Sequence, residues 1–426
     1  MINIDEKFLR LMHSPPKLLL VEHGGQTKEF IFQKIRGKSI ELYLACSQIP
    51  IWLQKYVYPE NIIKTDTYNS VILISDVSAF MVSHKISFTA VGTFWEHTVT
   101  QTADLVAALD LVGVTPGAAR RSSANKILMR EYCRKAGICT PKLTVLRNIK
   151  QLPDALEQVG LPAVLKPIFG NNSYGVVKIE RTVDIESLVQ LSQKTWSQAQ
   201  EEAFKNFSGI YLLERYAAGS VVTVDGIVQN KRIWIAGMVE VEMGPEPWFT
   251  QQANYLPPKL DSEIVELCYE MTRAIIQTLG FDNCGFHCEL RITRESPVMI
   301  EIAARLPGGW ILPAYERAYG IDLVSKMLDV WQGIDIEIKP AFTRHILQKG
   351  IFPTKPGQLQ SVRGYEEVRN MKGLWYFVEV TKVGKDVVTY PEVPQPIYFY
   401  AIEAESSQEL DHLSEELEAK IEIEID

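Results

Sequence analysis

Two glutamates have the spacing of a paired metal site. Glu289 and Glu301 each lie in an apolar segment with the pattern of a β-strand, and a short polar turn at 293–297 separates the segments. Strands joined in this way pair antiparallel, and side chains directly opposite each other lie about 5 Å apart. Two carboxylates that close suit Mg²⁺ shared with phosphate oxygens. The alternative is two solvent-facing glutamates on an exposed face of a sheet.

A lysine followed by a turn of small residues could bind phosphate. Lys166 ends an apolar run, and the segment Gly170–Gly175 holds two glycines, two asparagines and a serine. Glycine lets backbone N–H groups approach an anion, and small polar side chains add donors. The segment is not a Walker loop, because the lysine precedes the glycines and no helix follows. An ordinary hairpin turn is the alternative.

Two further cations are candidates for binding an anion. Arg305 is followed closely by Gly308 and Gly309. A guanidinium suits a carboxylate or phosphoryl group, and the N–H groups of adjacent glycines can face an oxyanion. Lys126 stands in the first turn of a predicted helix, where its charge opposes the helix dipole. A surface arginine before a turn and a solvated lysine are the alternatives.

The N-terminal part of the chain alternates short apolar runs with helical patterns. Strands are predicted at 17–21, 39–45, 71–74 and 88–91, and a helix at 98–111. Such alternation is typical of a small α/β domain with a parallel sheet. Residues 112–119, with Pro116 and two glycines, are predicted to form a linker.

The candidate residues lie on the elements that follow. Helices are predicted at 123–135, 184–200 and 262–279, and strands at 163–166, 176–179, 210–214, 221–228, 233–241, 285–292 and 298–302. Residues 244–258 contain four prolines and are predicted to be a long loop, which could serve as a lid. Residues 340–426 show short β patterns and a charged helix at 407–420. The final Glu-Ile-Glu-Ile-Asp segment fits either a strand or an acidic tail.

The composition is that of a folded, acidic protein. Of 426 residues, 46% are hydrophobic and 23% charged, and the net charge is −8. The hydrophobic content excludes global disorder. The negative net charge differs from the positive charge that nucleic-acid-binding proteins usually carry. No apolar stretch approaches the roughly 18 residues of a membrane span.

The six cysteines include no CxxC pair. Cys284, His287 and Cys288 could be imagined as zinc ligands, but a structural zinc site needs four ligands and no second pair lies nearby. The charged first ten residues do not have the pattern of a signal peptide. We therefore expect a reduced, cytoplasmic protein.

Seven short motifs carry a resemblance to a known superfamily. In order they are Asn125-Lys126-x-x-Met129-Arg130, Gly137-Ile138-x-x-Pro141, Leu161-Pro162-Ala163-Val164-Leu165-Lys166-Pro167, the Gly170–Gly175 segment, Leu213-Glu214-Arg215-Tyr216-x-x-Gly219, Gly285-Phe286-His287-x-Glu289 and Ile300-Glu301-Ile302-x-x-Arg305-x-x-Gly308-Gly309. Together they resemble the ATP-grasp carboxylate–amine ligases, and most of all the bacterial L-amino-acid ligases that make dipeptides. The resemblance runs from about residue 93 to residue 330.

The resemblance implies an ATP-grasp fold of α/β class, with α+β parts. The N-terminal parallel α/β domain would comprise residues 1–120, and the small lobe with the phosphate loop residues 121–208. The large lobe, with the Mg²⁺ and substrate sites, would comprise residues 209–338. A C-terminal β-rich subdomain would follow at 339–426.

The resemblance also implies roles in binding ATP and metal. Lys126 and Lys166 would hold phosphates, and a loop would close over them, formed by Gly170, Asn171, Asn172, Ser173, Gly175 and Val176. The adenine hinge would be Glu214, Arg215, Tyr216 and Ala217, with the Glu214 carbonyl and the Ala217 N–H contacting the base. Mg²⁺, or Mn²⁺ as an alternative, would be held by Glu289 and Glu301.

The implied catalytic residues are Arg305, Lys166, Gly308 and Gly309. Arg305 and the two glycines would bind the substrate carboxylate and then its acyl phosphate. The implied substrate pocket also includes His287, Gln251, Asn254 and Trp310. As a large aromatic residue, Trp310 could equally belong to the core.

Three positions depart from the family pattern. Ala303 stands where the family usually has an asparagine that ligates a second metal. The stretch after Gly219 lacks the acidic residue that binds ribose, and Asp225 is the nearby substitute. Residues 251–257 replace a Glu-x-x-His-x-x-Pro motif that contacts the ammonium of the first amino acid. The carboxyl substrate is therefore expected to lack a free α-amine or to carry a polar group.

The resemblance implies an ATP-dependent ligase that forms an amide bond through an acyl phosphate and releases ADP and phosphate. An amino acid or small peptide would be one substrate. The implied partners are small-molecule carboxylates and amines, together with a second copy of the chain in a homodimer. Two alternatives stay open: a ligase similar to biotin carboxylase or purine-pathway enzymes, and a non-catalytic ATP-binding regulator.

Overall fold

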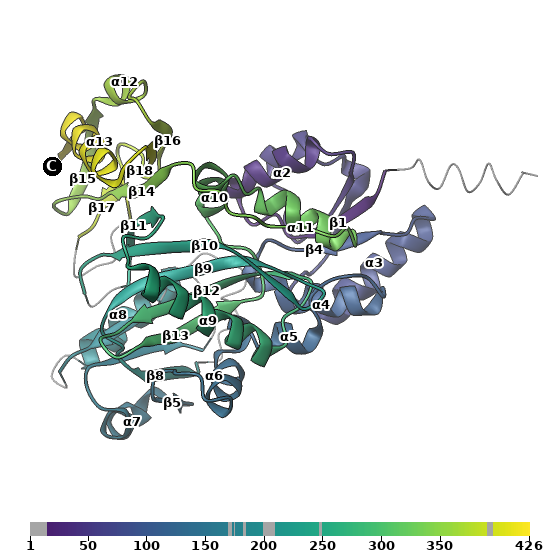
Figure 1. The fold of residues 1–426 in the computed structure, drawn as a ribbon, viewed down its shortest axis with the longest axis horizontal. Helices are drawn as coiled ribbons and strands as arrows, with labels where there is room; N and C mark the ends of the chain where they lie inside the picture. Colours follow the sequence, from purple (N-terminus) through teal and green to yellow (C-terminus); the bar gives the residue numbers. More distant parts are fainter. Residues whose placement is uncertain are drawn as a thin grey trace, which may run out of the picture.

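The computed structural model describes residues 15–426 except 169–172, 174, 182–184, 199–208, 247–248 and 390–394. In this part of the chain, an N-terminal parallel sheet packs beside a long antiparallel sheet (Figure 1). A small four-stranded sheet lies on the other side of the long sheet, and a three-stranded sheet lies at the C-terminal end.

The N-terminal sheet is parallel, as predicted. Its order is β3–β2–β1–β4, formed by Ile62–Lys64, Glu41–Cys46, Lys17–Val21 and Ala90–Gly92. Strand β1 is buried on both faces, since Leu18 and Leu20 join one core and Leu19 and Val21 another. Helices must therefore cover both faces. They are α2 (Glu29–Arg36) on one face, and α3 (Ser70–His84) and α4 (Val99–Ala108) on the other.

The strand predicted at 71–74 is wrong, because these residues form the first turn of α3. The Asn69 side chain accepts hydrogen bonds from the N–H groups of Val71 and Ile72 and thereby caps the helix. Leu73 and Val77 lie four residues apart and are both fully buried. The β-branched residues favour a strand, but the N-terminal cap and the burial of Leu73 and Val77 at helical spacing stabilise a helix instead.

The small lobe is a four-stranded antiparallel sheet in the order β5–β8–β6–β7. Its strands are Leu143–Leu146, Tyr211–Arg215, Ala163–Pro167 and Val177–Ile179, accompanied by helices α7 (Leu152–Val159) and α8 (Ile185–Gln198). Strand β8 follows the expected lobe boundary at residue 208, yet its pairing with β5 and β6 places it in the small lobe. Residues 116–119 of the predicted linker belong to α5 (Pro116–Arg120).

The large sheet has the order β13–β12–β9–β10–β11–β14–β18–β16. Its first four strands are Pro297–Ala303, Cys284–Ile292, Ser220–Gln229 and Arg232–Met243. Helices α6 (Lys126–Lys135) and α9 (Ser262–Leu279) cover one face. Helices α10 (Ile311–Tyr319) and α11 (Leu323–Trp331) cover the other, where one core joins the large lobe to the N-terminal domain.

The C-terminal subdomain continues this sheet. Strand β11 (Gln251–Leu256) lies inside the predicted loop 244–258, so that prediction is wrong over these residues. It pairs with β14 (His345–Ile351), which leads to β18 (Tyr398–Ala404) and β16 (Leu374–Glu379). The three-stranded sheet is β17 (Asp386–Val387), β15 (Gly357–Arg363) and β19 (Glu422–Ile425), with helices α12 (Tyr365–Val368) and α13 (Ser407–Lys420) nearby. The acidic end is thus a strand.

The six cysteines are free. Within the described part of the chain, no three His, Cys, Asp or Glu side chains gather as a metal site. Cys284 and Cys288 face the core beneath α9, and His287 lines a cavity on the opposite face of the strand. None of the described helices is long and apolar enough to cross a bilayer.

Candidate active site

A cavity of about 680 Å³ lies where the two lobes, the N-terminal domain and the C-terminal subdomain meet. Most of the residues with predicted roles line it: Lys126, Lys166, Ser173, Val176, Glu214, Arg215, Tyr216, Ala217, Gln251, His287, Glu289, Glu301, Arg305, Gly308 and Gly309. Gly170, Asn171 and Asn172 lie outside the described residues. Gly175 does not line the cavity, and its carbonyl accepts a 2.6 Å hydrogen bond from the Ser192 hydroxyl on α8.

Glu289 and Glu301 are directly opposite each other on β12 and β13, as predicted. Glu301 Oε2 lies 3.3 Å from Lys126 Nζ, and Glu289 Oε1 lies 3.7 Å from His287 Nε2. Burial raises the pKa of Glu289, but hydrogen bonding to His287 and the nearby lysine charges outweigh it and leave the pKa below its usual value. Hard carboxylate oxygens that face a cavity are suitable ligands for Mg²⁺ together with phosphate oxygens.

Lys166 is held by a buried cluster of charges. Its Nζ lies 2.6 Å from Glu214 Oε2, while Arg130 Nη2 lies 2.9 Å from Glu214 Oε1. All three residues are at most 6% exposed. Burial raises the pKa of Glu214, but the charges of Arg130 and Lys166 hold it below its usual value. Lys166 is thereby fixed at the cavity wall by an ion pair.

Arg130 was not among the predicted site residues. It lies four residues after Lys126 on α6, so both side chains leave the same face of that helix. Arg130 also donates to the Met299 carbonyl on β13. The helical spacing was a signal that sequence reasoning could have used.

The predicted hinge carries an aromatic and cationic wall. Arg291 Nη1 donates to Tyr216 Oη at 3.1 Å, and its guanidinium lies 5.5 Å from the centre of the Phe249 ring. The Tyr216 hydroxyl donates to Glu246 at 2.9 Å, and Lys178 Nζ lies 4.2 Å from the centre of the Tyr216 ring. Rings and a flat guanidinium suit an adenine base. Phe249 and Arg291 line the cavity but were missed by sequence reasoning.

Arg305 is oriented by a glutamate from the N-terminal domain. Its Nε donates to Glu96 Oε2, and Nη1 donates to the Leu306 carbonyl at 2.8 Å. Burial raises the pKa of Glu96, but the charge of Arg305 and a hydrogen bond from Ser123 outweigh it, so the pKa lies below its usual value. Arg305, Gly308 and Gly309 all line the cavity.

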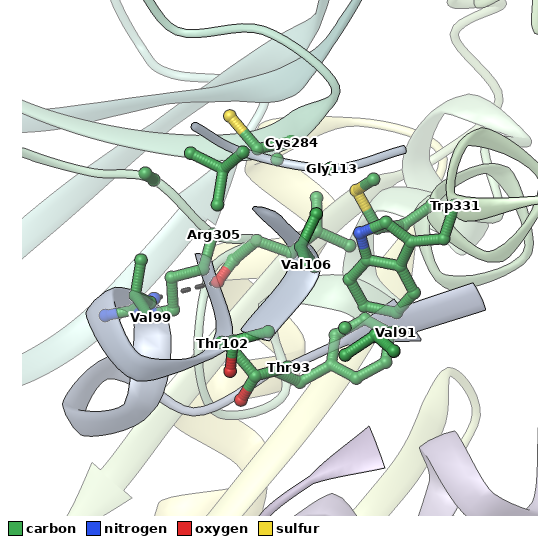
Figure 2. Close-up of a pocket in the computed structure, with 16 residues that line it drawn as sticks. Val91, Thr93, Val99, Thr102, Val106, Gly113, Cys284, Arg305 and Trp331 are labelled. Atoms are coloured by element: carbon green, nitrogen blue, oxygen red, sulfur yellow. Dashed lines mark hydrogen bonds between the residues drawn. The ribbon is translucent and has the colours of Figure 1, made fainter. Parts of the chain in front are cut away.

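A second, small cavity lies behind Arg305 (Figure 2). Its volume is about 20 Å³, enough for one water molecule. Thr102 Oγ1 lines it and has no hydrogen-bond partner among the described residues. A cavity of this size is far smaller than a pocket for a substrate or cofactor.

The prediction that Asp225 binds ribose is wrong. Asp225 is fully buried and does not line the cavity. Its carboxylate instead lies 2.6 Å from His287 Nδ1 and accepts hydrogen bonds from Tyr315 (2.8 Å) and Thr223 (3.1 Å). Burial lowers the pKa of His287, but the Asp225 charge and hydrogen bond raise it to about 9. Asp225 therefore positions His287, which faces Ala303 on the neighbouring strand.

Asn254 and Trp310 lie outside the cavity lining, so the structure does not bring them together with the other predicted substrate residues. Asn254 is buried within the sheet, between Val241 and Gln348. The Trp310 ring lies 3.8 Å from the Tyr376 ring, centre to centre, and 5.6 Å from the Phe30 ring. Trp310 thus packs between the N-terminal domain and the C-terminal subdomain. This agrees with the alternative prediction that Trp310 belongs to the core.

Comparison with known proteins identifies a domain of this chain and structures of the same fold. Residues 159–314 match a family profile described as an ATP-grasp domain. The chain contains an ATP-grasp domain. The L-amino acid ligase of Bacillus licheniformis superposes on 97% of this chain and 99% of its own, with a TM-score of 0.80 and 18% identity. The ATP-grasp fold therefore extends to the flanking domains.

Two curated relatives match this chain in sequence. Alanine–anticapsin ligase of Bacillus subtilis (strain 168) is 24% identical over 225 residues, which is 50% of this chain and 47% of that protein. Carnosine synthase 1 of Mus musculus is 23% identical over 356 residues, which is 78% of this chain and 41% of that protein. The chain thus spans about half the length of the curated relatives it matches.

Proposed function

We propose that this ATP-grasp protein is an ATP-dependent carboxylate–amine ligase, which forms an amide bond and releases ADP and phosphate. One observation carries the proposal: a single cavity brings together Lys126, Lys166, the Glu289–Glu301 pair and Arg305. The relatives named as alanine–anticapsin ligase and carnosine synthase support the same reaction class.

The first step transfers a phosphoryl group to the carboxyl substrate. Adenine would lie against residues 215–217 and the Tyr216–Phe249–Arg291 wall, with the phosphates between Lys126 and Lys166. A carboxylate oxygen then attacks the γ-phosphorus, and the bond to the leaving ADP breaks. Two anions meet in this step, so the two lysines and Arg305 stabilise the charge of the transition state.

The carboxylate pair fits a divalent cation. Glu289 and Glu301 would hold Mg²⁺, with Mn²⁺ as an alternative, and the ion would supply positive charge to the phosphates when bound. Ala303 contributes no ligand, so a second ion would depend on water or phosphate oxygens. His287 occupies the facing position on β12, held there by Asp225.

The second step forms the amide. Arg305, kept in place by Glu96, would hold the acyl group together with the N–H groups of Gly308 and Gly309. The amine nitrogen attacks the acyl carbon, the bond to phosphate breaks, and the nitrogen loses a proton. Acyl phosphates hydrolyse in water, so the enclosing walls of the cavity favour attack by the amine.

The C-terminal subdomain indicates the nature of the carboxyl substrate. Phe352, Pro396 and Phe399 line the same cavity as Ile311 and the two glycines. The acidic and histidine residues of the family's ammonium-binding motif are replaced by Gln251 and its neighbours. We infer a carboxylic acid with an apolar body and without a free α-amine.

The test is an ADP-release screen with MgATP, every amino acid singly and in pairs, β-alanine and simple carboxylic acids. ADP release that requires one specific pair, with the condensed mass in the product, would support the proposal. Lys166→Met should abolish the release, and Lys150→Met, at an exposed position of the small lobe, should not. ATP binding by thermal shift without ADP release from any pair would contradict ligase activity and favour a regulatory ATP-binding protein.

Assembly and location are further proposals. We infer a homodimer from the resemblance, and light scattering at several concentrations tests it. A cytoplasmic location is supported by six free cysteines. Fractionation of cells that express the tagged chain tests that location.

A further inference from the structure

Three neighbouring strands of the large sheet, β12, β9 and β10, line the cavity between the proposed adenine and metal sites. On β12, Arg291 of the adenine wall and Glu289 of the carboxylate pair are two residues apart, which is about 7 Å along a strand. The ribose of ATP joins the base to the phosphates. It would therefore lie over the residues of β9 that are paired with Arg291 and Glu289.

Two residues of β9 occupy this position. Val221 is directly opposite Arg291, and Thr223 is directly opposite Glu289. Directly opposite residues share a face of an antiparallel sheet, and Val221 and Thr223 both line the cavity. The Val221 side chain can neither donate nor accept a hydrogen bond.

The neighbouring surface is apolar as well. Val241, opposite Val221 on β10, and Met243 line the cavity beside it. Thr223 is 1% exposed and its hydroxyl donates to Asp225 at 3.1 Å, so it offers little to a ligand. We call Val221, Thr223, Val241 and Met243 the sugar floor.

The carboxylates around the cavity have basic partners. In the part of the chain that the structure describes, the cavity is lined by Glu96, Glu214, Glu289 and Glu301. Their ion-pair partners, in the same order and at 2.5 to 3.7 Å, are Arg305, Lys166, His287 and Lys126. None of the four glutamates belongs to the sugar floor, so this floor offers the ribose hydroxyls no carboxylate.

We propose that the sugar floor binds the nucleotide without hydrogen bonds to the ribose hydroxyls, so that 2′-deoxy-ATP serves as well as ATP. This inference rests on the proposed function, which places ATP in the cavity. A site that bonds a substrate hydroxyl rejects the analogue without it, because its own polar group is left unpaired, whereas an apolar wall discriminates little. The chemistry is unchanged: the carboxylate oxygen bonds to the γ-phosphorus as the bond to 2′-deoxy-ADP breaks.

The first test measures binding and needs no variant. Isothermal titration calorimetry gives the Kd of the wild-type protein for ATP, 2′-deoxy-ATP and 3′-deoxy-ATP, each with Mg²⁺. The three Kd values should agree within about threefold, whereas a hydrogen bond from a ribose hydroxyl to a charged group would separate them roughly 10- to 100-fold. Weaker binding of either deoxynucleotide by more than this threefold margin would overturn the proposal.

The second test places a carboxylate on the sugar floor. Val221→Glu adds an acceptor where the sugar is proposed to lie, and Arg291 directly opposite can balance its charge. The ratio of the Kd for 2′-deoxy-ATP to the Kd for ATP should rise roughly tenfold. Val71→Glu, at a position of α3 that is 77% exposed, is the matched control and should leave this ratio unchanged. An unchanged ratio in a folded Val221→Glu protein would refute the placement of the sugar over Val221.

A third variant keeps the test decisive if thermal unfolding shows that Val221→Glu does not fold. Gln251 is paired with Met243 across β10 and β11, and it also lines the cavity. Gln251→Ala should leave the Kd ratio unchanged, because the proposal assigns no hydroxyl contact to this amide. A fall in the ratio would mean that Gln251 bonds the ribose, and the proposal would be wrong.

The two proposals fail in different ways. Absence of binding by all three nucleotides, together with no ADP release, would refute the proposed function itself. Binding of ATP with discrimination against the deoxynucleotides would refute only the role of the sugar floor. In the ADP-release assay, the kcat/KM values for ATP and 2′-deoxy-ATP should likewise agree within about threefold.

Discussion

Replacing Glu96 with glutamine should weaken binding of the carboxyl substrate and leave ATP binding nearly unchanged. In the wild-type protein, Glu96 Oε2 accepts from Arg305 Nε and Oε1 accepts from the Ser123 hydroxyl. Glu96 is 9% exposed and the Arg305 side chain 13%, so water screens the pair little. The glutamine amide can still accept from Ser123. Its N–H group would then face the Arg305 N–H, and two donors cannot bond.

The magnitude follows from the lost interaction. A hydrogen bond to a charged group contributes about 1.5–3 kcal/mol. At about 1.4 kcal/mol per tenfold change, the kcat/KM for the carboxyl substrate should fall roughly 10- to 100-fold in Glu96→Gln. The KM for ATP should change less than about threefold, since Arg305 is proposed to contact the acyl group and not the nucleotide. Thermal stability should also fall, because Arg305 loses its buried counter-charge.

The assay is steady-state ADP release with one substrate varied at saturating levels of the others. Ser123→Ala is the matched control, since it removes only the hydroxyl and keeps the carboxylate–guanidinium pair. Its effect should be roughly fivefold, the contribution of an ordinary hydrogen bond of about 1 kcal/mol. A Glu96→Gln enzyme with unchanged kcat/KM for the carboxyl substrate, or with an equal loss in ATP affinity, would refute the positioning role of Glu96.

Three further predictions concern other parts of the structure. The pKa of Glu214 is lowered in the folded state, so ionised Glu214 stabilises the fold fully above its ordinary pKa of about 4.5, and this contribution is lost as pH falls through the folded pKa. Glu214→Gln should therefore lower the free energy of unfolding at pH 7 by about 3–5 kcal/mol. In urea titrations, the stability of this variant should depend less on acid pH than that of the wild type. Arg291→Met removes the hydrogen bond to Tyr216 and the flat cation. It should raise the KM for ATP roughly tenfold and change the KM for the carboxyl substrate little. An unchanged KM for ATP would contradict the proposal that Arg291 contacts the adenine base. Gly92→Ala would place a Cβ 2.4 Å from the Trp331 ring, so calorimetry should find it destabilised by about 1–3 kcal/mol, and a neutral result would mean that this contact can relax.

The local sequence pattern was sufficient to predict the pairing of the two glutamates at the centre of the site. Glu289 and Glu301 lie on consecutive strands with a short turn between them, and sequence periodicity alone placed them opposite each other. The parallel N-terminal sheet was likewise predicted from the alternation of strands and helices. The glutamate pair depends on residues close in the sequence, where turn chemistry and side-chain period determine the geometry. The sheet pairs strands as distant as β1 and β4, and it was predicted from the order of its elements instead.

Three predictions from local sequence were wrong because tertiary contacts determine the structure at these positions. The β-branched segment at 71–74 begins a helix, and β11 lies in a proline-rich stretch because β10 and β14 provide strand partners on both sides. Asp225, expected at the ribose, is buried by contacts with His287 and Tyr315. Each outcome depends on neighbours distant in the chain, which no local pattern reports.

The sequence by itself determined the kinds of residues available for chemistry: two lysines, a carboxylate pair, an arginine and adjacent glycines. Only the tertiary structure decided what holds them in place. Glu96 reaches Arg305 across 209 positions of sequence, and Arg130 and Glu214 meet across 84. A buried charge needs a partner in three dimensions, and the partner that the fold supplies is set by packing between domains rather than by spacing along the chain.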